Sequence, residues 1–381
     1  MRADLVIAGG GPVGLVTAIA GRQRGLHVVV VEQSPGLPEK ACGEGLMPGA
    51  VRVLDRLGVS SAGSVEFRGI RFVDGDVVAS ARFPAHSGRA LSRRRLMLAL
   101  DARARELGVE ILSGHTLRDF EYRGRVLSAR VSAAGAGTLT LRAQLLVGAD
   151  GLRSGVRRRL GHELPARGTQ RFGLQRHYRC VPWTDWVEVH WDDRVEAYVT
   201  PLGPDEVGVA LLCHGAPAPY DALLSRFPQL RARLAGGAAL TRVRGAGPFE
   251  QRVSQVLAPG VALVGDAAGY LDAVSGEGLS LGFRSALALI DRFASGELWR
   301  YPADHARITA TYQVVTRLML EIARRPRVRR GVIEYLARRP LLLSDLLGIA
   351  ADCRAPDCST ALGAGLRWGL APLAGHSGRA L

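Results

Sequence analysis

Lysine is almost absent from this sequence. Of its 50 basic residues only Lys40 is a lysine, and with 35 acidic residues the net charge is +15. Together with abundant alanine and glycine, the arginine bias is typical of a GC-rich genome. No zinc finger, RNA-recognition motif or other nucleic-acid module accompanies the charge. We therefore expect no nucleic-acid partner.

Cysteines and long apolar runs are also scarce. No CxxC pair and no histidine cluster at zinc spacing occurs, so we expect reduced thiols and no metal site. No run of about 18 apolar residues is present, and the first residues lack the charged and apolar regions of a signal peptide. These absences predict a cytoplasmic protein. The five cysteines are Cys42, Cys180, Cys213, Cys353 and Cys358.

What the sequence does contain is enough apolar material for two interleaved domains: 381 residues, 47% hydrophobic. It opens with the order strand, turn, helix, strand. The apolar run Leu5 to Ala8 precedes a glycine-rich turn, a helical segment follows from Pro12 to Arg24, and His27 to Glu32 forms the next strand. This βαβ opening predicts an α/β fold.

The turn carries Gly9-x-Gly11-x-x-Gly14 between the strand and the helix. In this motif the first glycine permits a tight turn, the second lets a pyrophosphate approach the backbone, and the third allows close helix packing. Glu32 ends the second strand, where an acidic side chain accepts hydrogen bonds from ribose hydroxyls. We therefore predict a dinucleotide contact, NAD or FAD, at the motif, at Glu32 and at three neighbours: Pro12, Val13 and Gln33.

A second strand-turn-helix element decides for FAD. The strand Val261 to Val264 is followed by Gly265-Asp266-Ala267-Ala268-Gly269 and then by Ser275-Gly276-Glu277-Gly278-Leu279. Here the sequence resembles the flavoprotein superfamily of aromatic hydroxylases, flavin-dependent halogenases and geranylgeranyl reductases. The resemblance implies that Asp266 binds the ribityl chain and that the helix opening at Gly276, Gly278 and Leu279 faces the flavin ring.

Two further motifs stand in the order of that superfamily. Gly148-Ala149-Asp150-Gly151 matches a strand-end motif whose aspartate, here Asp150, lies near the pyrophosphate. Ser92-Arg93 starts a helix, and the resemblance places Arg93 near the phosphate or ribityl part of FAD, with Arg94 and Arg95 as substitutes. The implied fold is a Rossmann-like FAD-binding domain of the glutathione-reductase type.

The middle of the chain changes character. Between about residues 172 and 252 alternating β-branched and aromatic runs predict an inserted antiparallel β-sheet substrate domain. We expect a discontinuous FAD-binding domain (1–75, 88–165 and 253–300), a substrate domain (76–87 and 166–252) and a C-terminal helical region (301–381). Five sheet residues are candidates to line the substrate pocket: His177, Tyr178, His190, Trp191 and Tyr198.

The cofactor alone does not choose the reaction. No second glycine motif follows a strand, so the resemblance implies that NADPH or NADH meets the flavin transiently or that an electron-donor protein replaces it. Hydroxylases of the superfamily carry a histidine and a proline where Gly269 and Ala273 stand here. The loop Lys40 to Leu46 looks closer to geranylgeranyl reductases, in which a cysteine comparable to Cys42 lies beside the flavin. Cys42 is therefore either a catalytic acid or shaping residue, or a small buried side chain.

These observations favour an FAD-dependent monooxygenase, a hydroxylase or epoxidase of an apolar aromatic, polyketide or isoprenoid molecule in secondary metabolism. The alternatives are a reductase of carbon–carbon double bonds and a flavin-binding scaffold without catalysis. The segments that mark halogenases, among them Trp-x-Trp-x-Ile-Pro, are missing. Arginines interleaved with apolar residues between Arg324 and Arg339 would also suit a peripheral membrane contact.

Overall fold

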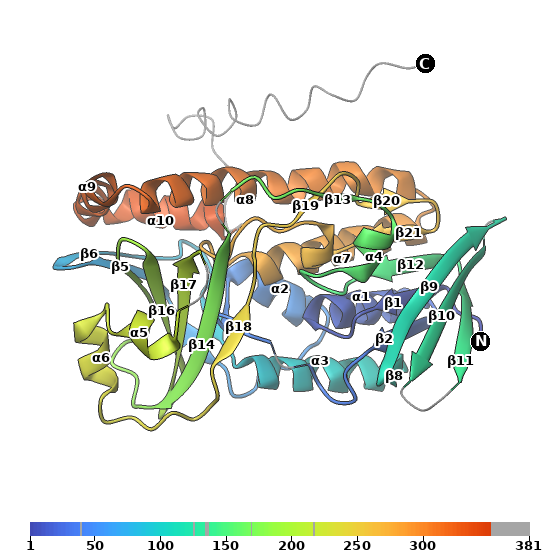
Figure 1. Ribbon diagram of the computed structural model, residues 1–381, viewed down its shortest axis with the longest axis horizontal. Helices are drawn as coiled ribbons and strands as arrows, with labels where there is room; N and C mark the ends of the chain where they lie inside the picture. Colours follow the sequence, from blue (N-terminus) through green and yellow to red (C-terminus); the bar gives the residue numbers. More distant parts are fainter. Residues whose placement is uncertain (39, 125, 134–136, 169, 216–217, 352–381) are drawn as a thin grey trace, which may run out of the picture.

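Three distant parts of the chain form one parallel sheet. The computed structural model describes residues 1–351 except 39, 125, 134–136, 169 and 216–217. Its central sheet has the order β20-β21-β12-β1-β2-β8 (Figure 1). All pairings are parallel except that of the edge strand β20. The strands are β1 (Leu5–Ala8), β2 (Val28–Glu32), β8 (Glu110–Ser113), β12 (Leu145–Gly148), β20 (Leu257–Ala258) and β21 (Val261–Leu263).

The strands next to the glycine turn are buried on both faces. Every residue of β1, β2 and β12 is buried, which explains their continuous apolar runs. Helix α1 (Pro12–Gln23) begins with Pro12 at its first turn, where the missing N–H costs nothing. It packs against α3 (Arg93–Glu106) and α7 (Gly278–Ala294). The predicted α/β fold is confirmed.

Smaller elements surround this layer. A three-stranded antiparallel sheet, drawn at the right of Figure 1, follows β8 in the chain. It contains β9 (His115–Arg123), β10 (Val126–Ala133) and β11 (Thr138–Ala143). The remaining elements here are β3 (Gly45–Leu46), β4 (Val65–Phe67) and β7 (Gly88–Ala90) in one sheet, β13 (Glu163–Leu164) and β19 (Arg252–Val253) in another, and helices α2 (Pro48–Arg56) and α4 (Gly155–Arg159).

The inserted sheet has seven strands, in the order β18-β14-β17-β16-β15-β5-β6. Its hairpin β5–β6 pairs along its whole length, and β5 also pairs with β15. The seven-stranded sheet therefore includes residues from Gly69 onward. The predicted boundary after residue 75 falls within this hairpin, and the division into domains stays a prediction. The strands are β5 (Gly69–Asp74), β6 (Val77–Arg82), β14 (Arg171–Arg179), β15 (Val187–Trp191), β16 (Val195–Gly203), β17 (Glu206–His214) and β18 (Arg244–Ala246).

Each face of the inserted sheet has a different neighbour. Val199, Val209 and alternate residues beside them pack against α5 (Tyr220–Leu224) and α6 (Pro228–Leu234). Because side chains alternate along a strand, Tyr198 and Ala210 point to the opposite face of the sheet. That inner face builds the site described below.

The chain then forms three helices along one side of the molecule (Figure 1). They are α8 (Tyr301–Ala323), α9 (Pro326–Ala337) and α10 (Pro340–Ala350). Pro326 and Pro340 each begin a helix, as their effect on the preceding residue requires. The predicted helical region thus holds to residue 350, and 352–381 lie outside the described residues. Within the described chain, no helix is both long and apolar enough to cross a membrane.

Candidate active site

Two glycines of the β1–α1 turn leave no room for a side chain. Gly9 has a φ of 106°, and a Cβ there would lie 2.5 Å from the carbonyl oxygen of Ala149. A Cβ on Gly14 would lie 1.9 Å from the Gly9 oxygen, whereas one on Gly11 would meet nothing within 4 Å. Packing therefore requires glycine at positions 9 and 14. The open space at Gly11, before the N-terminus of α1, suits a phosphate.

Glu32 holds this turn in place. Its carboxylate accepts hydrogen bonds from the backbone N–H of Gly10 at 2.7 Å and of Ser34 at 2.8 Å. A hollow of about 150 Å³ lies beside it, and its neighbour Gln33 is exposed. The contact of Glu32 with a ribose stays a prediction, and a structural role in the turn is added to it.

The motif after β12 is tied to the motif after β21 by a buried arginine. Asp150 caps α4 by accepting from the N–H groups of Gly155 and Val156, and its Oδ1 is buried without a hydrogen-bond partner in the described structure. Arg157 of α4 is fully buried and donates to the carbonyl oxygens of Asp266 and Ala267, each at 3.2 Å. The sequence motifs did not reveal this role of Arg157.

Asp266 lies in a short 3-10 helix, Gly265–Ala268, at the end of β21. Burial raises the pKa of its carboxyl, while the charges of Lys40, Arg93 and Arg157 lower it. A carboxylate that faces three cations at the cavity wall is well placed to accept hydrogen bonds from a ligand's hydroxyl groups.

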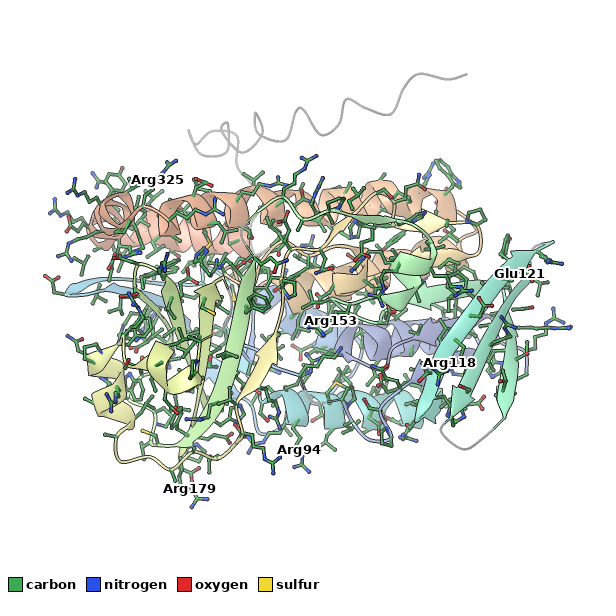
Figure 2. All side chains as sticks on the ribbon, in the orientation of Figure 1. Arg94, Arg118, Glu121, Arg153, Arg179 and Arg325 are labelled. Carbon is green, nitrogen blue, oxygen red and sulfur yellow. The ribbon has the colours of Figure 1, made fainter. Side chains whose placement is uncertain are left out.

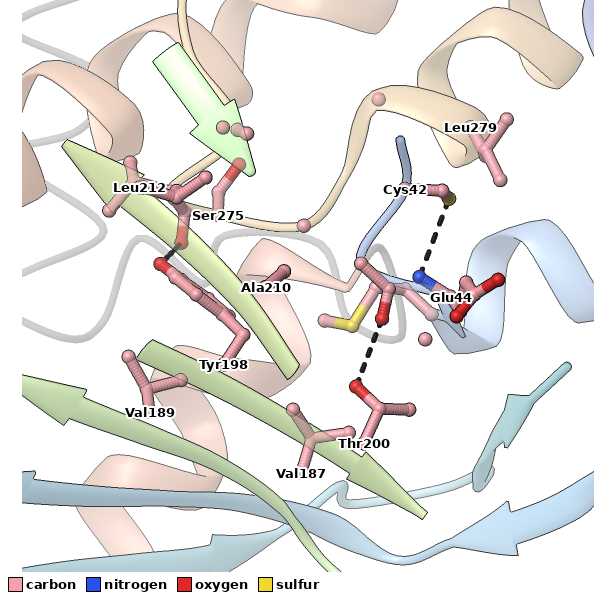
Figure 3. A pocket seen from close by; sticks show the side chains of 18 of the residues that line it. Cys42, Glu44, Val187, Val189, Tyr198, Thr200, Ala210, Leu212, Ser275 and Leu279 are labelled. Atoms are coloured by element: carbon pink, nitrogen blue, oxygen red, sulfur yellow. Dashed lines mark hydrogen bonds between the residues drawn. The ribbon is translucent and has the colours of Figure 1, made fainter. Parts of the chain in front are cut away.

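A cavity of about 260 Å³ separates the FAD-binding layer from the inner face of the seven-stranded sheet. In Figure 3, Cys42 and Leu279 lie on one side of it, with Tyr198 and Val189 on the other. Arg93 and Asp266 reach its wall from the motif segments. Most of its wall is apolar, including Met47, Phe67, Phe72, Val187, Ala210, Leu212, Phe249 and Met319.

Three features of this wall fit a flavin. The Nε of Arg93 is buried and lacks a hydrogen-bond partner among the described residues, so a ligand group there would satisfy it. Gly276, with a φ of 70°, has open space where its side chain would be. Helix α7 begins two residues later, at Gly278, and its free N–H groups lie at the cavity. This donor set matches the needs of the isoalloxazine and ribityl groups of FAD.

Comparison with known families decides the assignment. The model of the FAD binding domain family matches residues 2–200, more than half of the chain. The protein belongs to this family of FAD-binding flavoproteins. It is accordingly an FAD-dependent oxidoreductase, and FAD is its cofactor.

The relatives of this flavoprotein catalyse more than one kind of reaction. It is 31% identical to a menaquinone reductase of Mycolicibacterium smegmatis, over 79% of this chain and 78% of the relative. It is 30% identical to a para-nitrophenol 4-monooxygenase of Pseudomonas sp., over 74% and 75% of the two chains. The solved flavoprotein/dehydrogenase of Cytophaga hutchinsonii, 19% identical, covers 92% of this chain with a TM-score of 0.81 and supports the fold.

The loop before β3 brings Cys42 into the cavity wall of the flavoprotein. Its sulfur accepts a weak hydrogen bond from the N–H of Glu44, at 3.4 Å. Burial raises the pKa of the thiol, and the charge of Arg93 lowers it less. The thiol is thus held protonated at the cavity wall, which permits it to donate a proton.

The structure separates the predicted pocket residues. Tyr198 lines the cavity and donates from its hydroxyl to the Val274 oxygen at 2.8 Å. His177 lies behind the wall and is bonded to Glu44. Three other candidates, Tyr178, His190 and Trp191, lie away from the cavity in the packing of the sheet.

The sequence analysis missed Glu44 and Gln175, which both reach the cavity wall. Gln175 donates from Nε2 to the Glu44 carboxylate at 2.8 Å. The available signal was an ionisable residue between two glycines in the Cys42 loop.

Two arginines were proposed as substitutes for Arg93. Arg94 points outward at the lower edge of Figure 2, and Arg95 donates to the backbone oxygens of Gly63 and Leu202.

Proposed function

We propose that this flavoprotein is a monooxygenase that hydroxylates or epoxidises an apolar aromatic, polyketide or isoprenoid molecule, with NADPH or NADH as the transient reductant. The observation that carries the proposal is the apolar cavity between the N-terminus of α7 and the inserted sheet. Such a cavity binds an apolar substrate and keeps water away from the reaction.

The bound FAD supplies the electrons and the reaction with oxygen. The residues of the protein would hold the FAD in position. The N-terminus of α1 and the space at Gly11 would hold the phosphates, while Arg93 and Asp266 would hold the ribityl part. The backbone N–H groups at Gly278 would stabilise negative charge on the reduced ring. The relationship to the para-nitrophenol monooxygenase supports this reaction type.

Within the described residues, the six-stranded sheet is the only parallel sheet with a glycine turn leading into a helix. We therefore propose that the nicotinamide cofactor, or an electron-donor protein in its place, binds transiently at the surface. A dedicated second dinucleotide domain is not needed for this exchange.

Reduction of a carbon–carbon double bond is the second candidate. It requires a hydride from the flavin and a proton from an acid, and the protonated thiol of Cys42 at the cavity wall favours it. The relative named menaquinone reductase supports a reduction.

We further propose a peripheral contact of α9 and α10 with an anionic membrane surface, from which an isoprenoid substrate would enter. Leu341 is 82% exposed and Tyr335 51% exposed, and the guanidinium of Arg339 lies 3.9 Å from the centre of the Tyr335 ring. Arg325, just before α9, lies at the upper edge of Figure 2. Sedimentation with vesicles containing phosphatidylserine tests this contact, and replacement of Leu341 by serine should weaken it.

One experiment separates the two reactions. The purified yellow protein is reduced anaerobically with NADPH or NADH and mixed with candidate aromatic, polyketide and isoprenoid substrates, with and without oxygen. An oxygenated product formed only with oxygen supports the monooxygenase. Reoxidation of the flavin by an alkene without oxygen supports the reductase.

A further inference from the structure

Three polar side chains lie in a row from the cavity to the β16–β17 turn: Glu44 of the Cys42 loop, His177 of β14 and Glu206 of β17. The Nε2 of His177 lies 2.6 Å from Oε2 of Glu44, and its Nδ1 lies 2.8 Å from Oε1 of Glu206. The side chains of Glu44 and His177 are 3% and 7% exposed, whereas Glu206 is 21% exposed. Because Glu44 lines the cavity, the row connects the cavity with solvent.

The cavity end of this row is rigidly held. Glu44 has a φ of 60°, a conformation that is costly for a residue with a side chain and that often marks functional sites. Its Oε1 accepts from the N–H of Arg93 at 2.7 Å. Gly208 leaves space for its carboxylate, because a Cβ there would lie 3.3 Å from Oε2. The hydrogen bond from Arg93 and the space at Gly208 therefore hold the Glu44 carboxylate at one defined position.

The middle of the row carries a proton at neutral pH. Burial alone would lower the pKa of His177, but hydrogen bonds with Glu206 and Glu44 raise it to about 9. The pKa of Glu206 is lowered by its hydrogen bond with His177 and, less strongly, by the charge of Arg95. The charged groups that face the imidazole are thus Glu44 from the Cys42 loop and Glu206 from β17, with Arg95 of α3 beyond it.

We propose that Glu44, His177 and Glu206 form a proton path that supplies the flavin-facing cavity from solvent. The path rests on the proposed oxidoreductase function and serves either reaction type. Hydroxylation converts substrate, O2, NAD(P)H and one proton into hydroxylated substrate, water and NAD(P)⁺. Double-bond reduction converts an alkene, NAD(P)H and one proton into the saturated product and NAD(P)⁺. Each turnover therefore consumes one proton at the cavity.

The transfer conserves protons at each step. The imidazolium of His177 gives its Nε2 proton to the Glu44 carboxylate, and the resulting carboxyl group releases it into the cavity. The neutral imidazole changes tautomer and takes a proton from solvent by way of Glu206, which restores the charged ring. Proton transfer of this kind requires donor and acceptor within hydrogen-bond distance, as His177 is to both Glu44 and Glu206.

The first test measures the relay without catalysis. In protein labelled with ¹⁵N-histidine, the His177 signal should titrate near pH 9, and Glu206→Gln should lower that pKa. Asp205→Asn, an exposed neighbour in the same turn, should leave the titration unchanged. Titration of His177 near its ordinary value of about 6.5 in the wild type would overturn the proposal.

The second test measures proton supply without a substrate. Reoxidation of the reduced flavoprotein by oxygen consumes one proton for each hydrogen peroxide formed from the anionic reduced flavin. Glu206→Gln should bind FAD normally, reoxidise about tenfold more slowly and show a larger solvent isotope effect. Asp205→Asn should match the wild type.

The outcomes distinguish the two proposals. If Glu206→Gln and His177→Gln keep the wild-type reoxidation rate and pH profile, the proton path is overturned, whatever product the enzyme makes. If both variants are slow but no oxygenated product forms with any substrate, the proton path stands and the monooxygenase assignment fails.

Discussion

Arg329 on α9 and Asp74 at the end of β5 form a buried ion pair although 255 residues separate them in the chain. The Nε of Arg329 lies 2.8 Å from Oδ2 of Asp74, and the two side chains are 4% and 12% exposed. The pair links the C-terminal helices to the seven-stranded sheet. These helices also contribute to the cavity wall, because Leu347 of α10 lines the cavity.

Removal of Asp74 leaves the buried Arg329 with only a longer ion pair, 3.5 Å from the exposed Asp193. We expect Asp74→Ala to lower the free energy of unfolding by about 3–5 kcal/mol, measured by urea denaturation. The control is Arg330→Met, which breaks the adjacent exposed pair with Asp76 and should change the stability little. Equal effects of the two variants would contradict the role of the buried pair.

Gly11→Val should give a folded protein without FAD. The structure has open space for the side chain, so folding is not disturbed, but the valine would occupy the position proposed for the phosphates. The ratio of flavin absorbance to protein absorbance measures the effect. Gly236→Val, at another glycine with open space far from the motifs, should keep normal FAD content.

Asp266→Ala should also yield colourless protein with an unchanged circular dichroism spectrum. The buried carboxylate is proposed to accept hydrogen bonds from the ribityl hydroxyls, and alanine cannot replace them. Asp266→Asn keeps one acceptor oxygen and should retain part of the FAD. Normal flavin content in the alanine variant would refute the assignment of this residue.

Cys42→Ala distinguishes an acid from a packing residue. If the thiol donates a proton in double-bond reduction, the variant should bind FAD but lose turnover, whereas a hydroxylase should keep most of its rate. Both Cys42 and Cys180 are partly exposed, so their reactivities can be compared directly. Because burial raises the pKa of the Cys42 thiol, iodoacetamide at pH 7.5 should modify Cys42 more slowly than Cys180. Faster modification of Cys42 would contradict its protonated state.

Stability should depend on pH through His177. Its pKa is about 9 in the folded state and about 6.5 in the unfolded chain. The contribution of the imidazolium is therefore fully present below pH 6.5 and is lost as the pH rises through 9. The difference in unfolding free energy between the wild type and His177→Gln should shrink by a few kcal/mol from pH 6 to pH 10. His86→Gln, at an exposed position, should show no such change.

The FAD-binding layer was predictable because its signals are local. Gly9 and Gly14 are dictated by backbone contacts within the turn and with Ala149, and each motif lies at the end of a strand that is buried along its length. The β5–β6 hairpin was assigned less well. Nothing in its short alternating strands shows that β5 pairs in parallel with β15, more than 100 residues later.

The candidate site divides in the same way. The family and the cofactor could be predicted from the residues alone, since glycine turns and helix starts are local properties of the backbone. The contact of Glu44 with His177, 133 residues away, could not be predicted, and neither could the inward direction of His177 and the outward direction of Tyr178. The register of β14 and β17 fixes these directions, and register depends on packing between distant strands.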